Sequence, residues 1–218
     1  MKNVLVIGAS RGIGRAVCET AARQGHHVKA FSRSGTPISS RRGGTIDVVK
    51  GDALNAADLE GALEGVDVVV QALGVPVSMD LITKPVTLFS SATRVLIPAM
   101  EKIGVTKLIA VTGFGAGDSN SAINPLQRIP FRAFLGRAYD DKTIQENLIE
   151  KSDLDFLFVR PGVLTNGPAT GKAKILMQPH EWRNGVVSRA DVAEFIVEQL
   201  GQETLGRQKP VIIRHRLL

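Results

Sequence analysis

The chain opens with an arrangement that few folds share, a short apolar run followed at once by a glycine-rich turn. Val4–Ile7 is apolar throughout, and Gly8, Gly12 and Gly14 come directly after it. Apolar residues then recur at helical spacing from Ala16 to Ala21. We therefore predict a buried strand, a tight turn and a helix. The free N–H groups and the positive dipole end of that helix would converge on one place, which suits a diphosphate.

Length and composition set the outer limits. A chain of 218 residues suits one domain, and 44% hydrophobic with 22% charged residues is typical of globular proteins. No apolar run approaches the ~20 residues of a membrane span, and the N-terminus reads as a strand rather than a cleavable signal. Cys18 is the only cysteine, which excludes an internal disulfide, and its side chain is expected to be buried on the apolar face of the first helix. These features predict a cytoplasmic protein that does not bind membranes.

The net charge of +6 raises the question of nucleic acid. The basic residues are scattered, however, and aromatic residues make up only 5% of the chain. A cofactor that carries several negative charges explains part of the basic excess equally well. We therefore predict no nucleic-acid partner, and a monomer or small homo-oligomer.

Apolar strands and amphipathic helices alternate along the rest of the chain. The predicted strands after the first are His27–Ser32, Thr45–Lys50, Val66–Gln71, Thr106–Thr112, Leu154–Arg160 and Pro210–Arg214, the last an edge strand because it begins with proline. The predicted helices after the first are Ala56–Leu63, Val86–Ile103, one from Tyr139 to about Lys151, and one capped by Ser188. The alternation predicts a single α/β domain over residues 1–218, a Rossmann-type doubly wound parallel sheet of about seven strands.

Two irregular segments interrupt this alternation. Residues 118–138 mix apolar side chains with arginines, and residues 163–187 carry glycine and proline turns. We interpret both as lid or substrate-loop regions, the first with a short helix over the site. A plain surface loop with a few anchoring apolar residues is the alternative for residues 118–138.

The end of the second predicted strand bears on the choice of cofactor. In a fold of this kind that strand tip lies beside the adenosine ribose, where an acid binds both ribose hydroxyls and repels a 2′-phosphate. This chain has Arg33 there, with Arg11 inside the glycine turn. Both favour a 2′-phosphate and so predict NADP(H) over NAD(H), unless they are merely solvated arginines. Asp52 is expected near the adenine, whereas Arg41 and Arg42 read better as solvated loop charges.

Taken together, the motifs resemble the short-chain dehydrogenase/reductase superfamily in its atypical NAD(P)H-binding branch. The chain looks similar to biliverdin IXβ/flavin reductases and to NmrA-like proteins, which share its compact size. The resemblance is carried by Gly8–Gly14, Gly51-Asp52, Ala72–Gly74, Val111–Gly113, Asp141-Lys142 with Glu146, Arg160–Gly162 and Ser188–Ala193. It implies cofactor contacts from Gly8, Ser10, Arg11, Gly12, Ile13, Gly14, Arg33, Asp52, Ala53, Leu73, Gly74, Thr112, Gly113, Lys142, Pro161, Gly162 and Val163.

The catalytic set of the superfamily is only partly matched. That set is a serine after the fifth strand, then a tyrosine and a lysine four residues apart on the next helix. Here Gly113 stands where the serine would, with Thr112 just before it, and Tyr139 precedes Lys142 by three residues. Both spacings share a helix face. The resemblance thus implies Tyr139 and Thr112 as catalytic residues and Lys142 as a ribose or nicotinamide contact; a packed tyrosine and a solvated lysine are the alternatives.

A weakened proton-donating set favours acceptors that accept hydride without a proton donor from the protein, such as a flavin, a quinone or another conjugated small molecule. The protein would then mainly position the nicotinamide against the acceptor in an apolar pocket. The expected pocket walls are Phe114, Phe131, Phe134, Val163 and Leu164. The four histidines, His26, His27, His180 and His215, have no ligand spacing, so we predict no metal site.

Two other functions stay open at this level. A non-catalytic redox sensor of the NmrA type would bind NADP(H) and report on it to a protein partner, which suits the altered catalytic set. A sugar-nucleotide epimerase or dehydratase shares the opening motif but usually has a substantial C-terminal substrate domain. Only about fifty residues follow Pro161 here, so this function ranks last.

Overall fold

The computed structural model describes residues 1–39, 43–76 and 84–216, leaving aside the side chains at positions 125, 127, 130 and 131. Arg41 and Arg42, and part of the loop after the fourth strand, therefore lie outside the described residues. Within these ranges no helix is both long enough and apolar enough to cross a membrane.

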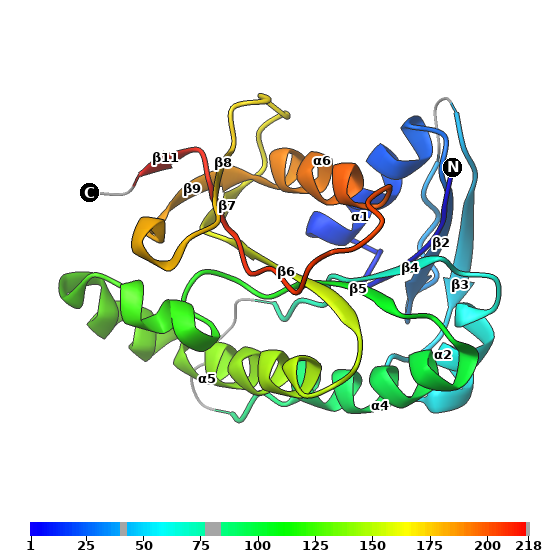
Figure 1. Ribbon diagram of the computed structural model, residues 1–218, viewed down its shortest axis with the longest axis horizontal. Helices are drawn as coiled ribbons and strands as arrows, with labels where there is room; N and C mark the ends of the chain where they lie inside the picture. Colours follow the sequence, from blue (N-terminus) through cyan, green and yellow to red (C-terminus); the bar gives the residue numbers. More distant parts are fainter. Residues whose placement is uncertain (40–42, 77–83, 217–218) are drawn as a thin grey trace.

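A large sheet forms the middle layer (Figure 1). Its order is β3-β2-β1-β4-β5-β6-β10-β8, and all neighbours run parallel except the antiparallel pair β10–β8. A second sheet has the order β11-β9-β7. The strands are β1 Asn3–Ile7, β2 His27–Ser32, β3 Ile46–Lys50, β4 Val68–Gln71, β5 Lys107–Val111, β6 Asp155–Pro161, β7 Val163–Thr165, β8 Lys174–Leu176, β9 Gly185–Ser188, β10 Val211–Ile213 and β11 His215–Arg216.

Helices cover both faces of the large sheet. In Figure 1, α1 and α6 lie on one side of the sheet, and α2, α4 and α5 lie on the other. The helices are α1 Gly12–Arg23, α2 Ala56–Leu63, α4 Leu88–Ile103, α5 Pro125–Glu150 and α6 Arg189–Gln199, with short 3-10 turns η1 Gly117–Ala122 and η2 Pro179–Glu181. The predicted doubly wound parallel architecture is confirmed.

Alternation along each strand divides the core in two. Val4 and Val6 of β1 pack with α1 and α6, whereas Leu5 and Ile7 pack with α2 and α4. Successive strand side chains point to opposite faces, so a strand buried on both faces must be apolar at every position. Cys18 lies fully buried in the first of these layers, and burial raises its thiol pKa to about 12.

The C-terminal part of the sheet differs from the sequence prediction. The predicted edge strand is β10, which lies between β6 and β8, so the edge assignment is wrong. Pro210, whose missing N–H suggested an edge, lies just outside the strand bounds. β7, β8 and β9 fall in the segment read as a loop, because strands of three or four residues are too short for an alternating pattern to be recognised.

The largest difference concerns α5. The sequence predicts a lid at residues 118–138 and a new helix at Tyr139, but one helix runs from Pro125 to Glu150. Its start has a recognisable signal: the Asn124 side chain accepts a hydrogen bond from Leu126 N (3.0 Å), and Pro125 occupies the first turn. The predicted short lid helix is thus the first half of a long one, preceded by η1.

The opening motif folds as predicted, and Gly14 shows why a glycine is needed. A Cβ atom at Gly14 would overlap the carbonyl oxygen of Gly8, so the helix could not lie this close to the turn. We expect Gly14→Ala to lower the free energy of unfolding by about 1–3 kcal/mol through this overlap.

The matched control is Gly61→Ala in the exposed middle of α2, where an added Cβ meets nothing within 4 Å. This substitution should stabilise the protein by about 0.5–1 kcal/mol, since alanine favours the helix. Urea unfolding of both variants measures the contrast. Equal stabilities would contradict the packing role assigned to Gly14.

Candidate active site

A cavity of about 960 Å³ opens at the carboxyl ends of the parallel strands. It is lined by residues that directly follow six strands: Gly8, Arg33, Gly51, Ala72, Thr112 and Gly162. The crevice at this end of an open α/β sheet is where ligands bind in this architecture.

The cavity brings together most of the residues singled out in the sequence. Its lining includes Gly8, Ser10, Arg11, Gly12, Ile13, Arg33, Asp52, Ala53, Leu73, Gly74, Thr112, Gly113, Tyr139, Lys142, Pro161 and Gly162. Gly14 does not line the cavity, because it packs beneath the turn. Val163 does not line it either, and its side chain is 50% exposed.

Other lining residues were missed by the sequence argument. Ser32, Ser34, Thr36, Phe89, Asn166 and Arg189 all face the cavity. The two hydroxyl residues beside Arg33 were a visible signal, since a serine or threonine near an arginine suits a phosphate. Arg189 belongs to the Ser188–Ala193 motif, but no contact with the cofactor was predicted for it, and nothing in the local sequence marks Asn166.

The charge of the lining is strongly one-sided. Among the described residues it holds four cations, Arg11, Arg33, Lys142 and Arg189, and one carboxylate, Asp52. Asp52 Oδ1 accepts a hydrogen bond from Leu54 N (3.0 Å), which holds the carboxylate at the end of β3. This donor set fits a polyanionic nucleotide, because several cations converge with one acid among them.

At the end near β2, hydroxyl groups lie beside Arg33. Ser34 Oγ and Thr36 Oγ1 are 2.7 Å apart, and Ser32 Oγ lies 3.5 Å from Ser34 Oγ. Each hydroxyl can donate to a phosphate oxygen, and an arginine adds two parallel N–H groups. The loop after β2 thus carries hydroxyl and guanidinium groups of the kind that bind a phosphate.

The other end of the cavity holds Tyr139. A Cβ built on Gly113 would lie 2.6 Å from Tyr139 Oη, so the phenol fills the space that a side chain at position 113 would need. Gly113 also has φ of +145°, which disfavours other residues. A serine side chain at position 113 would collide with the Tyr139 phenol in this position, so the glycine and the placement of the tyrosine depend on each other. Burial raises the pKa of Tyr139 to about 12, so the phenol keeps its proton at neutral pH.

Lys142 lies one helical turn further along α5 and faces the same cavity. Its Nζ donates to the carbonyl of Val111 (3.2 Å) and lies 4.1 Å from the centre of the Phe89 ring. Burial lowers the pKa of this ammonium group to about 8, against the opposing charges of Glu146 and Asp141. Tyr139 and Lys142 therefore converge on the cavity despite their spacing of three.

Thr112 has a different environment. Its Oγ1 donates to Glu146 Oε1 (2.6 Å), and Glu146 also accepts two hydrogen bonds from Arg160, at 3.0 and 2.6 Å. All three residues are buried. Thr112 lines the cavity, but its hydroxyl hydrogen is already engaged in the hydrogen bond to Glu146. A catalytic role for Thr112 therefore stays a prediction to which this geometry adds no support.

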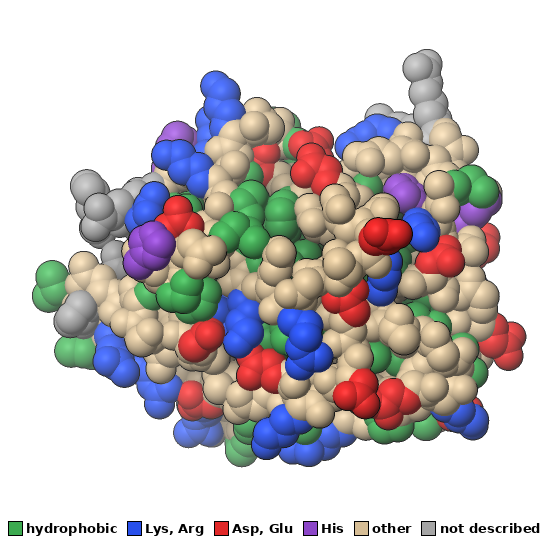
Figure 2. Space-filling view, viewed as in Figure 1, with side chains coloured by type: hydrophobic (Ala, Val, Ile, Leu, Met, Phe, Trp, Pro, Cys, Tyr) green, Lys and Arg blue, Asp and Glu red, His purple; other side chains and the backbone are tan. Residues whose placement is uncertain are grey.

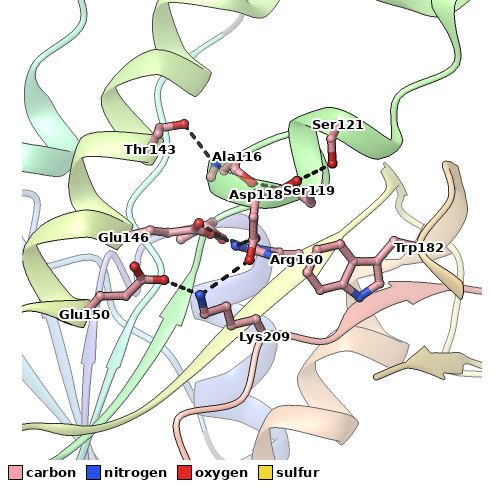
Figure 3. Close-up of polar contacts among 12 residues, drawn as sticks. Ala116, Asp118, Ser119, Ser121, Thr143, Glu146, Glu150, Arg160, Trp182 and Lys209 are labelled. Atoms are coloured by element: carbon pink, nitrogen blue, oxygen red, sulfur yellow. Dashed lines mark hydrogen bonds and ion pairs between the residues drawn. The ribbon is translucent and has the colours of Figure 1, made fainter. Parts of the chain in front are cut away.

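Figure 3 shows how this buried pair continues to the surface. Asp118 Oδ1 contacts Arg160 Nη2 (2.6 Å), and Lys209 pairs with both Asp118 and Glu150. The Arg160 guanidinium also lies 5.1 Å from the Trp182 ring centre. Although burial opposes it, contact with Glu146 and Asp118 raises the pKa of Arg160 above its ordinary value.

A second buried carboxylate joins α5 to α4. Asp141 Oδ2 accepts hydrogen bonds from Phe89 N (2.8 Å) and Ser90 N (3.3 Å), the first turn of α4. Thr87, which precedes that helix, provides no side-chain cap of its own. Asp141 thus replaces the missing cap from another helix and fixes Phe89 above Lys142.

The apolar walls are partly corrected. Leu164 lines the cavity as expected, but Phe134 does not and is 61% exposed on α5. Phe114 lies instead in a separate cluster with Trp182 and Leu176. The Phe131 side chain lies outside the described residues. No group of three or more potential metal ligands occurs in the described part of the chain. On the face shown in Figure 2, Lys and Arg side chains are interspersed with Asp and Glu.

Comparison with known proteins assigns the family. The family described as NAD(P)H-binding matches residues 8–203. The chain belongs to this NAD(P)H-binding family. An uncharacterized chloroplastic protein of Arabidopsis thaliana is 30% identical over 209 residues, which cover 93% of this chain and 73% of that protein. An isoflavone reductase homologue of Zea mays is 33% identical over 135 residues, or 58% of this chain and 40% of that protein.

A solved structure is similar to this chain over nearly its full length. The structure of ChuY from Escherichia coli O157:H7, described as an anaerobilin reductase, is 28% identical, with a TM-score of 0.81. It matches over 99% of this chain and 98% of that one. The expected atypical branch of the short-chain dehydrogenase/reductase superfamily is thus confirmed, and so is an oxidoreductase-type NAD(P)-binding fold.

Because the pKa of Lys142 is lowered in the folded state, the free energy of unfolding should depend on pH. The folded state loses the Lys142 proton near pH 8, while the unfolded chain keeps it to the ordinary lysine value of 10.5. Between these values the unfolded state binds more protons, so this group contributes stability that grows as pH rises. The free energy of unfolding of wild type relative to Lys142→Met should therefore increase from pH 8 to pH 10, by at most about 1.4 kcal/mol per pH unit. Urea titrations at each pH provide the measurement, and a flat difference would contradict the burial of the ammonium group.

A double-mutant cycle tests the Glu146–Arg160 pair. Arg160→Met leaves a buried carboxylate without its partner and should cost about 3–5 kcal/mol. Adding Glu146→Leu to this variant should recover part of that loss, because the unpaired charge disappears. Additive losses from the two single variants, measured by urea unfolding, would show that the pair does not act as a unit.

Proposed function

We propose that this protein is an NADPH-dependent reductase that transfers hydride to a flavin, a quinone or a similar conjugated small molecule. The observation that carries the proposal is one cavity that is lined both by the glycine turn with Arg33 and by Tyr139, Lys142 and Gly113. The reductase named for the E. coli neighbour supports an activity of the same type.

Different residues along the cavity would bind different parts of the cofactor and the acceptor. Arg33 with Ser34 and Thr36 would bind the 2′-phosphate, and the turn at the start of α1 would bind the diphosphate. The nicotinamide supplies the hydride when it is bound. Lys142, held by Val111 O and the Phe89 ring, would orient the nicotinamide ribose. Phe89 and Leu164 line the cavity, and there they would pack against the acceptor and limit the access of water to it.

Tyr139 holds a proton at the edge of that space. With its pKa raised to about 12 the phenol is protonated at neutral pH, so it can donate a hydrogen bond or a proton to a reduced acceptor. Acceptors that are already electrophilic, such as quinones, would depend on it little. We propose this range of acceptors because the catalytic set lacks the serine.

The second candidate function is an NmrA-like sensor that binds NADP(H) without turnover. The replacement of the serine by Gly113 and the high pKa of the Tyr139 phenol favour it, since neither suits a tyrosinate that relays protons. NADPH oxidation with FMN and with small quinones separates the two functions. Turnover with any of them supports the reductase. No turnover, combined with similar affinities for NADP⁺ and NADPH, would favour the sensor.

Arg33 gives a prediction about cofactor choice. Arg33→Asp should weaken NADPH binding by about tenfold to a hundredfold, because a charge-assisted pair is lost and an acid now faces the 2′-phosphate. NADH affinity should change by less than about threefold. Fluorescence titration of both nucleotides measures the ratio, and an equal loss for both would contradict the preference for NADPH.

Tyr139→Phe tests the proton donor and removes only the hydroxyl. If the phenol protonates the product, kcat should fall by about a hundredfold or more for acceptors that need a proton. The kcat for quinones and the KM for NADPH should change little. Stopped-flow and steady-state assays with an α,β-unsaturated carbonyl compound, whose enolate must be protonated after hydride transfer, and with a quinone give the comparison, and an equal loss with both acceptors would argue for a structural role.

A further inference from the structure

Arg189 lines the cavity close to the glycine turn. It is the first residue of α6, and α6 packs directly against α1. Arg189 Nε lies 3.9 Å from the position that a Cβ on Gly12 would occupy, and both residues line the cavity. The guanidinium therefore faces the place where the glycine turn and the first turn of α1 offer their N–H groups.

The Arg189 side chain is held in this position by a specific partner. Its Nη1 donates to Asn166 Oδ1 at 2.6 Å, and Asn166 also lines the cavity. Among the described residues no carboxylate pairs with Arg189, so its charge is not neutralised within the part of the chain that the structure describes. A half-buried arginine oriented in this way is prepared for an anion.

Asp191 fixes the loop that carries Asn166. Its carboxylate accepts hydrogen bonds from Thr170 N (2.7 Å), Gly171 N (3.0 Å) and Ser188 Oγ (2.8 Å). The same serine caps α6 by accepting from Asp191 N (3.0 Å). The start of α6 and the loop over residues 166–171 thus form one connected unit, which holds Arg189 and Asn166 at the cavity wall.

We infer that Arg189, oriented by Asn166, is a second anion-binding point of the cavity that contacts the cofactor diphosphate from the α6 side. Arg33 serves the 2′-phosphate and Arg189 serves the diphosphate, so the two arginines recognise different groups of one ligand. The inference rests on the proposed nucleotide site but not on turnover. The same guanidinium chemistry would also suit a carboxylate on the acceptor, and the experiment separates these two sources.

The test uses three ligands that divide these groups. NADPH carries both anionic groups, NADH carries only the diphosphate, and 2′-AMP carries a 2′-phosphate without a diphosphate. Arg189→Gln should weaken NADPH and NADH alike by about tenfold to a hundredfold, the usual loss of a charge-assisted hydrogen bond. It should leave 2′-AMP within about twofold. Arg33→Asp should show the reverse pattern, weakening NADPH and 2′-AMP and sparing NADH.

Arg15→Gln is the matched control. Arg15 lies on α1, pairs with Glu19 at the surface and does not line the cavity, so its loss removes the same charge without the contact. It should change none of the three affinities by more than about twofold. Asn166→Ala should reproduce the Arg189→Gln pattern more weakly, because it removes only the orienting bond. Thermal melting of every variant shows whether it is folded, and Arg189→Lys provides a milder change if Arg189→Gln is unstable.

The outcomes are distinct. If wild type binds neither NADPH nor NADH, the proposed function itself fails. If wild type binds both and Arg189→Gln binds them as tightly, the diphosphate assignment is overturned. The assignment is also overturned if Arg189→Gln changes only the KM for anionic acceptors such as FMN, with neutral quinones unaffected, since Arg189 then serves the acceptor. Loss of NADPH and NADH affinity with 2′-AMP unchanged supports the inference.

Discussion

The carboxylate of Glu146 joins the elements that carry the candidate active site. It accepts one hydrogen bond from Thr112 at the end of β5 and two from Arg160 on β6, so it joins α5 to two strands at once. The contact is buried and charged, which makes it costly to break and fixes the rotation of α5. Tyr139 and Lys142 lie on the same helix and face the cavity because that rotation is fixed. Asp141 adds a second constraint through the first turn of α4.

The cavity that results has two regions that differ in exposure and in charge. Near β2, Arg33 and neighbouring hydroxyls lie in a loop open to solvent, where a phosphate can be bound without a large desolvation cost. Near α5, Lys142 and Tyr139 are partly buried, and burial shifts both pKa values toward the neutral forms. Low polarity there strengthens each remaining hydrogen bond and suits a planar, conjugated acceptor. The exposed end at Arg33 and the partly buried end at Tyr139 and Lys142 thus belong to one cavity.

Sequence reasoning succeeded for this fold where the pattern is local. β2 and α2 have the predicted bounds, and Ser188 caps α6 as expected, because apolar period and capping residues act over a few positions. It failed for α5, whose first half was predicted as a lid because apolar residues and arginines are mixed there, although Asn124 and Pro125 already marked a helix start. It also failed for β8, because this strand has only three residues and forms by pairing with β10, which is distant in the sequence.

By itself, the sequence determined the opening strand, turn and helix, the parallel sheet, and the kind of ligand that such a turn binds. These follow from backbone preferences and side-chain periods within short windows. Only the tertiary structure decided that the phenol of Tyr139 occupies the space above Gly113, that Phe89 covers Lys142, and that Arg189 faces the glycine turn. Each of these contacts joins residues far apart in the chain, so its geometry depends on how whole helices pack against the sheet.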